Sequence, residues 1–252
     1  MIVLYLVFGI GLILLSYMYV EAFRNRLRIH KLSYDTLPQA FDAFRVFFIS
    51  DLHRRKLSPK LLDQMDHKCD LVIIGGDLVE RGVSIDRYNE NLRLLTQLGP
   101  TYFVWGNNDM EVDQATFEDS LSSHGVVVLS NSSDYFEVKD EQIRIIGLEE
   151  NWEDSAINEN MSGEEKQDFT ILVSHYPDVI REAQEILFPH LSLSGHTHGG
   201  QIRFLGFGIA EKGGLKKEKG SWHLISNGYG TTSLPLRLCA PAEAHMIVLK
   251  RR

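Results

Sequence analysis

The side chains best suited to chemistry in this sequence are Asp, Asn and His residues that follow short apolar runs. Each run has the length and the β-branched or aromatic content of a strand. Open α/β sheets place their ligands at the carboxyl ends of the strands, so we expect these side chains to converge on one rim. The candidate donors, in chain order, are Asp51, His53, Asp77, Asn107, His175, His196 and His198.

This donor set indicates a metal site. Carboxylate, amide and imidazole ligands together suit Mn, Fe or Zn better than they suit a calcium cage. Seven donors are too many for one tetrahedral ion and fit two ions that share a carboxylate. Three glycines at the same strand ends, Gly76, Gly106 and Gly195, are expected to let the backbone turn sharply there.

The elements that must position these donors are short strands and a few helices. Strands are predicted at 45–50, 71–74, 101–105, 126–129, 135–138, 143–146, 170–174, 191–194, 223–226 and 245–249. Helical spacing of apolar residues predicts helices at 59–67, 85–97 and 178–186. The alternation in the first half predicts a parallel sheet covered by helices, and the strand-rich second half predicts a second sheet. The fold class is therefore α/β, a mixed two-sheet sandwich.

Two charged segments are expected to be surface features rather than sites. The segment 216–219, Lys-Lys-Glu-Lys, resembles a mixed-charge surface turn. The segment 149–154 is predicted to be a solvated loop, although its position after a strand brings it within reach of the rim.

The first twenty residues contain no charged side chain. A helix of that length is about 30 Å long, which matches the hydrocarbon core of a bilayer. No small-residue cleavage site follows, and Tyr17 and Tyr19 fit an interfacial aromatic belt. We therefore predict a single-pass anchor at 1–22 that makes no contact with the core, a juxtamembrane segment with a first strand at 23–44, and a catalytic domain at 45–252.

Charge provides two further expectations. The cations that follow the anchor place the catalytic domain in the cytoplasm, at the cell membrane, by the positive-inside tendency. They are Arg24, Arg26, Arg28 and Lys31. The formal net charge of −8 argues against a nucleic-acid partner, because such binding needs clustered Lys and Arg. An anionic substrate would have to be attracted by bound metal instead.

In this order and spacing the motifs resemble the calcineurin-like metallophosphoesterase superfamily, whose pattern is D-x-H, G-D, G-N-H-D, H and G-H-x-H. The sequence around 195–201 and 227–237 is similar to a bacterial, membrane-anchored subgroup. The resemblance implies a four-layer α/β/β/α sandwich. It also implies that Asp51, His53 and His198 bind a first ion, that Asp77 bridges, and that Asn107, His175 and His196 bind a second ion.

One position departs from the family pattern. Asn108 stands where the family has a histidine that binds the phosphoryl group and assists the leaving oxygen. An amide can donate a hydrogen bond but cannot transfer a proton near pH 7. Asp109 remains available as the second member of a catalytic pair, and Arg54 and Arg237 are the cationic candidates for binding substrate.

The sequence therefore predicts a membrane-anchored hydrolase with two divalent ions (Mn, Fe or Zn), acting on a phosphodiester or a pyrophosphate. Its substrate would be a phosphorylated small molecule or a lipid-linked compound. Two alternatives stay open at this point. One is a phosphomonoesterase of the same fold, and the other is a non-catalytic module that uses its metals to hold a phosphorylated ligand.

Overall fold

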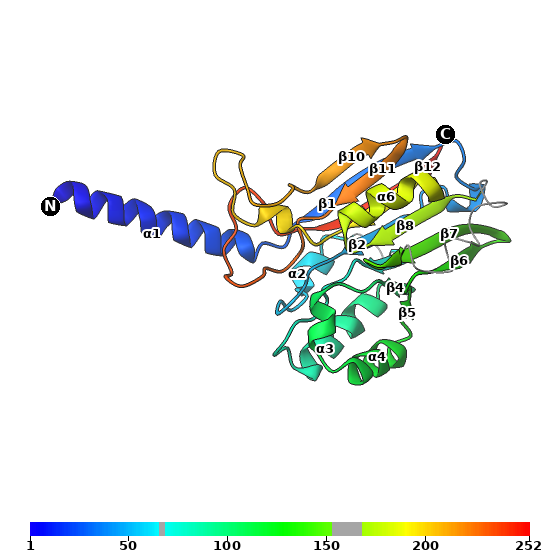
Figure 1. Cartoon of the computed structure of the whole chain (residues 1–252), viewed down its shortest axis with the longest axis horizontal. Helices are drawn as coiled ribbons and strands as arrows, with labels where there is room; N and C mark the ends of the chain where they lie inside the picture. Colours follow the sequence, from blue (N-terminus) through cyan, green and yellow to red (C-terminus); the bar gives the residue numbers. More distant parts are fainter. Residues whose placement is uncertain (66–68, 153–167) are drawn as a thin grey trace.

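The body of the molecule consists of two six-stranded sheets that face each other, with helices on the outer faces (Figure 1). Helices α3 (Ile85–Thr96) and α4 (Gln114–Ser123) cover one face, and α6 (Pro177–Leu187) covers the other. The predicted α/β/β/α sandwich is confirmed. The computed structural model describes residues 1–65, 69–152 and 168–252.

The first sheet is mixed. Strands β2, β3, β4 and β5 run parallel to one another, whereas β12 is antiparallel to β2 and parallel to β1. The alternation of strands and helices therefore predicted this parallel segment correctly. In spatial order the strands are β1 (Leu27–Tyr34), β12 (Ala244–Arg251), β2 (Arg45–Ile49), β3 (Leu71–Ile74), β4 (Thr101–Phe103) and β5 (Val127–Val128).

The second sheet has a parallel centre and antiparallel edges. Strands β11, β9, β8 and β7 are parallel, and β10 and β6 are antiparallel to their neighbours. The segment 216–219 is not a surface turn, because its first three residues belong to edge strand β10; charged side chains are common on such edges. In spatial order the strands are β10 (Gly214–Glu218), β11 (Ser221–Ile225), β9 (Leu191–Ser194), β8 (Thr170–Ser174), β7 (Glu141–Leu148) and β6 (Ser132–Val138).

The core follows from the two-residue periodicity of the strands. Phe48 of β2 packs between the sheets with Ile171 of β8, whereas its neighbour Phe47 packs on the other face with Leu92 of α3. Leu172 of β8 points away from the first sheet and packs against α6. Alternate side chains thus join the four layers through three interfaces and hold the strand ends in fixed register.

Two helices differ from the sequence-based expectation. Helix α4 was not predicted, because Phe117 and Leu121 are the only large apolar side chains on a mostly polar segment; Asp113 caps it by accepting a hydrogen bond from the Thr116 backbone N–H at 3.0 Å. The helix expected at 59–67 is shorter: α2 (Pro59–Leu62) is a single turn, and residues 66 and 67 lie outside the described residues. Short 3₁₀ turns complete the fold: η1 (Gln39–Phe41), η2 (Asn108–Glu111) and η4 (His198–Gly200).

The N-terminal helix α1 (Ile2–Ala22) projects away from the sandwich (Figure 1). It is long and apolar enough to cross a membrane: its most apolar window has a mean hydropathy of 2.2 and is 6 % buried. Its last turn, however, packs on the domain. Met18, Glu21 and Ala22 are buried, and the Arg237 backbone N–H donates to Met18 O at 3.0 Å. The expectation that the anchor makes no contact with the core is therefore wrong.

Candidate metal centre

The structure brings the predicted donors together at one rim of the sandwich. The carboxyl ends of β2, β3 and β4 in the first sheet meet those of β8 and β9 in the second, and each donor lies just beyond one of these ends. Two sheets therefore supply one site, which explains why residues almost 150 positions apart in the chain can touch.

The first group of donors is Asp51, His53 and His198, all buried. Nε2 of His53 lies 3.0 Å from Nε2 of His198, and Oδ1 of Asp51 lies 3.3 Å from that same His198 nitrogen. One ligand atom from each residue thus falls within 4.8 Å of the others, as three ligands of one ion would.

The second group is a chain of contacts that begins at Asp77. Oδ2 of Asp77 lies 3.3 Å from Nε2 of His175, which lies 3.2 Å from Nδ1 of His196. That His196 nitrogen is 3.1 Å from Oδ1 of Asn107. Asp77 Oδ2 also lies 3.7 Å from Nε2 of His53, so this carboxylate stands between the two groups.

The backbone at the donors is strained. Asp51, His53, Asp77, His196 and His198 have φ angles of 55°, 51°, 52°, 69° and 48°. Non-glycine residues in this left-handed region cost about 1–3 kcal/mol each and cluster at functional sites. Five of the seven candidate donors are held this way, and the strain turns each side chain sharply off its strand end.

The expected glycines serve two purposes. Gly76 has φ +82° and makes the turn that was predicted for it. Gly106 and Gly195 instead provide room: a Cβ would lie 2.3 Å from Asp77 Oδ1 at the first and 2.5 Å from Asp51 Oδ2 at the second. These two glycines allow the backbone to approach the buried carboxylates.

The surroundings of the candidate ligands shift their pKa values. Burial tends to raise the pKa of Asp77, but the His175 imidazole outweighs it and holds this pKa at about 2. Burial lowers the pKa of His198 to about 4, so its ring is neutral at pH 7. Metal binding requires charged carboxylates and neutral imidazoles. Burial lowers the pKa of His175 but the Asp77 carboxylate raises it to about 9, so an ion that enters the site would displace the proton on this ring.

Two further observations fit the donors to a metal. Oδ2 of Asp51 is buried with no hydrogen-bond partner among the described residues. Nδ1 of His175 is 2.9 Å from Gly75 O, and Nδ1 of His53 is 3.1 Å from Glu80 Oε2. Because these oxygens only accept, each Nδ1 carries a proton and each Nε2 faces the other donors, where it can bind an ion in the neutral ring. Ring nitrogens and carboxylate oxygens that converge in this way can hold a cation between them.

The comparisons with known proteins decide the family. A family model described as calcineurin-like phosphoesterase matches residues 44–200. The chain belongs to the calcineurin-like phosphoesterases. The resemblance found in the sequence is thereby confirmed, and so is the expectation of a metal-dependent phosphoester hydrolase.

The chain is also similar to individual proteins. The Bacillus subtilis (strain 168) protein named Uncharacterized protein YpbG is 40 % identical over 235 residues, 92 % of this chain and 90 % of that protein. Phosphodiesterase YaeI of Escherichia coli (strain K12) is 27 % identical over 174 residues, 64 % of this chain and 62 % of that protein. Among solved structures, Phosphopantetheinyl Hydrolase (PptH) from Mycobacterium tuberculosis aligns with a TM-score of 0.49 and 16 % identity, covering 73 % of this chain and 89 % of that one.

Arg237 does not line the open cleft of this phosphoesterase. Its side chain is fully buried, and its guanidinium donates to the carbonyl oxygens of Asn227 at 2.6 Å and Gly230 at 2.7 Å. Nη2 also lies 3.1 Å from Nδ1 of His198. The expectation that Arg237 binds substrate is corrected on this geometry: its guanidinium lies behind the candidate ligand His198.

Arg54 remains a candidate for binding substrate. Its ion-pair partner, Glu80, is a residue of the site that sequence reasoning missed. The Arg54 side chain is 69 % exposed and forms an ion pair with Glu80. Glu80 contacts His53 through its other carboxylate oxygen, and the hydrogen bond with His53 lowers the pKa of Glu80. The acidic residue three positions after Asp77 is the only sequence signal for this role, and it is a weak one.

Asp109 is not placed for catalysis. Its carboxylate is fully buried and accepts hydrogen bonds from the backbone N–H groups of Asp77 at 2.7 Å, Gly106 at 2.9 Å and Val79 at 3.0 Å. It therefore joins the loop after β3 to the loop after β4. The expected role as a catalytic partner of residue 108 is corrected, because both of its oxygens are occupied by backbone.

Asn108 is half-buried at the edge of the site. Its backbone N–H donates to Asp77 Oδ1 at 2.8 Å, and its side-chain Oδ1 accepts from Asn107 Nδ2 at 2.9 Å. Its Nδ2 lies 3.3 Å from Glu111 Oε1, so the carboxylate beside this side chain is that of Glu111, which sequence reasoning did not single out.

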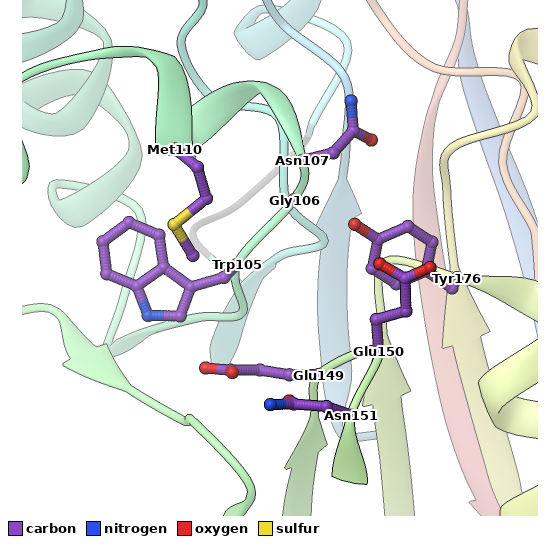
Figure 2. A pocket seen from close by; sticks show the side chains of 8 residues that line it. All are labelled: Trp105, Gly106, Asn107, Met110, Glu149, Glu150, Asn151 and Tyr176. Carbon is purple, nitrogen blue, oxygen red and sulfur yellow. The ribbon is translucent and has the colours of Figure 1, made fainter.

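One side of the cleft is acidic. Glu149 and Glu150 line a pocket of about 380 Å³ together with Trp105, Asn107 and Tyr176. Figure 2 shows Trp105 and Met110 on one side of it, with Glu150 and Tyr176 on the other. The loop expected at 149–154 thus does reach the rim, although residues 153 and 154 lie outside the described residues. Burial, reinforced by the Glu150 charge, raises the pKa of Tyr176 to about 12, so this phenol stays protonated.

Proposed function

We propose that this phosphoesterase holds two divalent transition ions and hydrolyses phosphodiesters or pyrophosphates at a membrane surface. The observation that carries the proposal is the position of Asp77, whose Oδ2 lies 3.7 Å from His53 and 3.3 Å from His175. A carboxylate between two donor groups is suited to bridge two ions. Mn, Fe or Zn fits the mixed oxygen and imidazole ligands.

The remaining donors divide between the two ions. Asp51, His53 and His198 would hold the first, and Asn107, His175 and His196 would hold the second. When bound, a pair of ions supplies charge stabilisation for a transferred phosphoryl group and a nucleophile at neutral pH.

The chain's own polar groups then orient the substrate. Arg54 is exposed beside His53, so its guanidinium can leave Glu80 and bind phosphoryl oxygens in the bidentate manner of arginine. The Asn108 amide can donate a hydrogen bond to a phosphoryl oxygen but cannot protonate a leaving group. This combination favours leaving groups that depart as stable anions, as the phosphate of a pyrophosphate does.

The site is proposed to work close to a bilayer. Helix α1 passes the length and composition test for a membrane span, and its last turn is packed on the domain. The distance between site and membrane surface would therefore be fixed rather than set by a loose linker.

The test combines metal analysis with hydrolysis. The full chain in detergent, saturated with Mn, is expected to hold close to two ions and to hydrolyse bis(p-nitrophenyl) phosphate. Asp77→Asn should lose both ions and the activity, because it removes the shared ligand. Asp119→Asn, an exposed carboxylate on α4, is the matched control and should retain both.

The same preparation separates the alternatives. A wild-type chain that binds one ion or none would contradict the two-metal site. Faster hydrolysis of p-nitrophenyl phosphate than of the diester would favour a phosphomonoesterase.

A further inference from the structure

Two loops beside the metal centre present an unusual group of apolar side chains to solvent. Five large side chains in them are 62–99 % exposed: Phe204, Leu205, Phe207, Ile209 and Leu234. Contiguous apolar surface of this kind marks an interaction site in a stable protein. We call these five residues the apolar rim.

The exposure is built into the loop. Phe204 and Phe207 exchange backbone hydrogen bonds of 2.8 and 2.9 Å, which close a tight hairpin. The Arg203 guanidinium donates to the carbonyl oxygens of Gly199, Gly206 and Ala210 at 2.7–2.9 Å. With its polar backbone groups satisfied from inside, the loop turns its aromatic side chains outward.

The apolar rim is continuous with the end of α1. Ile202 pairs with Leu238 across the two loops, and the Arg203 backbone N–H donates to Leu238 O at 2.9 Å. The next residue back, Arg237, donates its backbone N–H to Met18 O in the last turn of α1. Both loops lie at the α1 end of the molecule (Figure 1). Because the apolar rim lies next to the end of α1, the partner we infer for it is the bilayer that α1 would enter.

A pocket connects the apolar rim to the metal centre. It has a volume of about 550 Å³, and its lining includes the apolar residues Ile202, Ile209, Ala210 and Leu234 as well as His196 and His198 of the candidate metal site. None of its lining residues in the described part of the chain is acidic. The pockets on the opposite side of the cleft contain Glu149, Glu150, Asp178 and Glu182.

We infer that this phosphoesterase takes an amphiphilic phosphoester from the bilayer, with the hydrocarbon part in the apolar pocket and the apolar rim in the membrane interface. The inference rests on the proposed function and adds a substrate class to it. The acidic side of the cleft repels a second anionic group, whereas the apolar side can accept a chain. Each methylene moved from water into such a pocket is worth up to about fourfold in binding.

The first experiment varies chain length at a constant leaving group. Methyl, butyl and hexyl p-nitrophenyl phosphate are offered below their micelle concentrations to the full chain in detergent. Water replaces p-nitrophenolate on phosphorus, leaving the alkyl phosphate and releasing one proton to the buffer. We expect kcat/KM to rise roughly tenfold or more from methyl to butyl. The double variant Ile209→Ser/Leu234→Ser should flatten the rise and leave the methyl ester unaffected, and Ile186→Ser on α6 is the matched control.

The second experiment tests the membrane surface. In vesicles of phosphatidylcholine with brominated acyl chains, Leu205→Trp should be quenched strongly and Ile186→Trp should not. A flat chain-length dependence in wild type, or an unquenched Leu205→Trp, would overturn the inference. If no ester is hydrolysed although metals are bound, the proposed function fails. In that case the binding of alkyl phosphates tests the apolar pocket by itself: tighter binding of hexyl phosphate than of methyl phosphate supports it, and equal binding contradicts it.

Discussion

Asn108 occupies the position at which the family pattern has a histidine, and the residues around it determine what a histidine could do there. Asp109 cannot orient such a ring, because three backbone N–H groups occupy its carboxylate. Glu111 can, because its Oε1 already lies 3.3 Å from the Asn108 side chain. This phosphoesterase therefore has no histidine at position 108 to act as a general acid, but Glu111 could orient a histidine placed there.

The variant Asn108→His should accelerate esters whose leaving group needs a proton. A positioned general acid contributes typically 10²–10⁴-fold, so we expect at least about a tenfold gain for alkyl leaving groups. For esters with aryl leaving groups of low pKa, kcat/KM should change little. The measurement is the slope of log kcat/KM against leaving-group pKa, which should be steep in wild type and flatter in the variant.

A second substitution identifies the orienting group. Adding Glu111→Gln to Asn108→His should remove much of the gain, whereas Glu111→Gln alone should have a small effect. An unchanged slope in Asn108→His would mean that another group already supplies the proton.

At the scale of the elements, the strand ends were the most predictable part of the molecule. The runs at 71–74, 170–174 and 191–194 match β3, β8 and β9 in full. The first is a continuous apolar segment, as is typical of a strand buried on both faces, the second is apolar between Thr170 and Ser174, and the third alternates Leu and Ser. The donors at their ends were predictable for the same reason. A strand that stops at Gly, Asp or His leaves a recognisable boundary in the sequence.

The elements and roles that were missed depend on contacts made far away in the chain. Strand β10 has a charged sequence and exists because it pairs with β11 at the sheet edge. The burial of Arg237 depends on carbonyl groups of two loops and on His198, none of which its own neighbourhood in sequence reveals. Composition therefore predicts neither strand β10 nor the burial of Arg237.

One arginine makes several of the contacts that dock the end of α1. Arg55 donates to Ala22 O at 3.2 Å, Phe23 O at 2.7 Å and Arg24 O at 3.0 Å, and its guanidinium stacks 3.7 Å from the Tyr229 ring centroid. Cations at a helix C-terminus and hydrogen bonds from charged donors are both stabilising.

Arg55→Ala should therefore loosen the helix end. We expect the free energy of unfolding to fall by about 2–4 kcal/mol, which lowers Tm by roughly 4–16 °C in a domain of this size. Trypsin should also cut faster after Arg24 and Arg26. Arg55→Lys should rescue only part of the loss, because lysine lacks the planar fork. Arg93→Ala removes an exposed arginine of α3 and should leave both measurements unchanged.

For the whole molecule, the packing of α1 joins anchor and catalytic domain into one unit. The last turn of the helix, the loop that follows His53 and the loop that carries Arg237 contact one another. In the proposed membrane-anchored form, the metal centre would therefore keep one orientation relative to the bilayer, and the side of the membrane on which it lies would determine which leaflet can supply its substrate.

Orientation follows from the charges next to α1. Arg24 and Arg26 both pair with Glu21, at 3.3 and 3.0 Å, but the positive-inside tendency counts cations, and acidic neighbours contribute little to it. We expect the domain to be cytoplasmic, so that protease added to intact cells leaves a reporter fused after Arg252 uncut and degrades it once the membrane is opened. Replacing Arg24 and Lys31 by alanine should expose a fraction of the reporter, whereas replacing Lys139 and Lys250 should not. Cleavage of the wild-type reporter in intact cells would reverse the orientation and restrict the phosphoesterase to substrates of the outer leaflet.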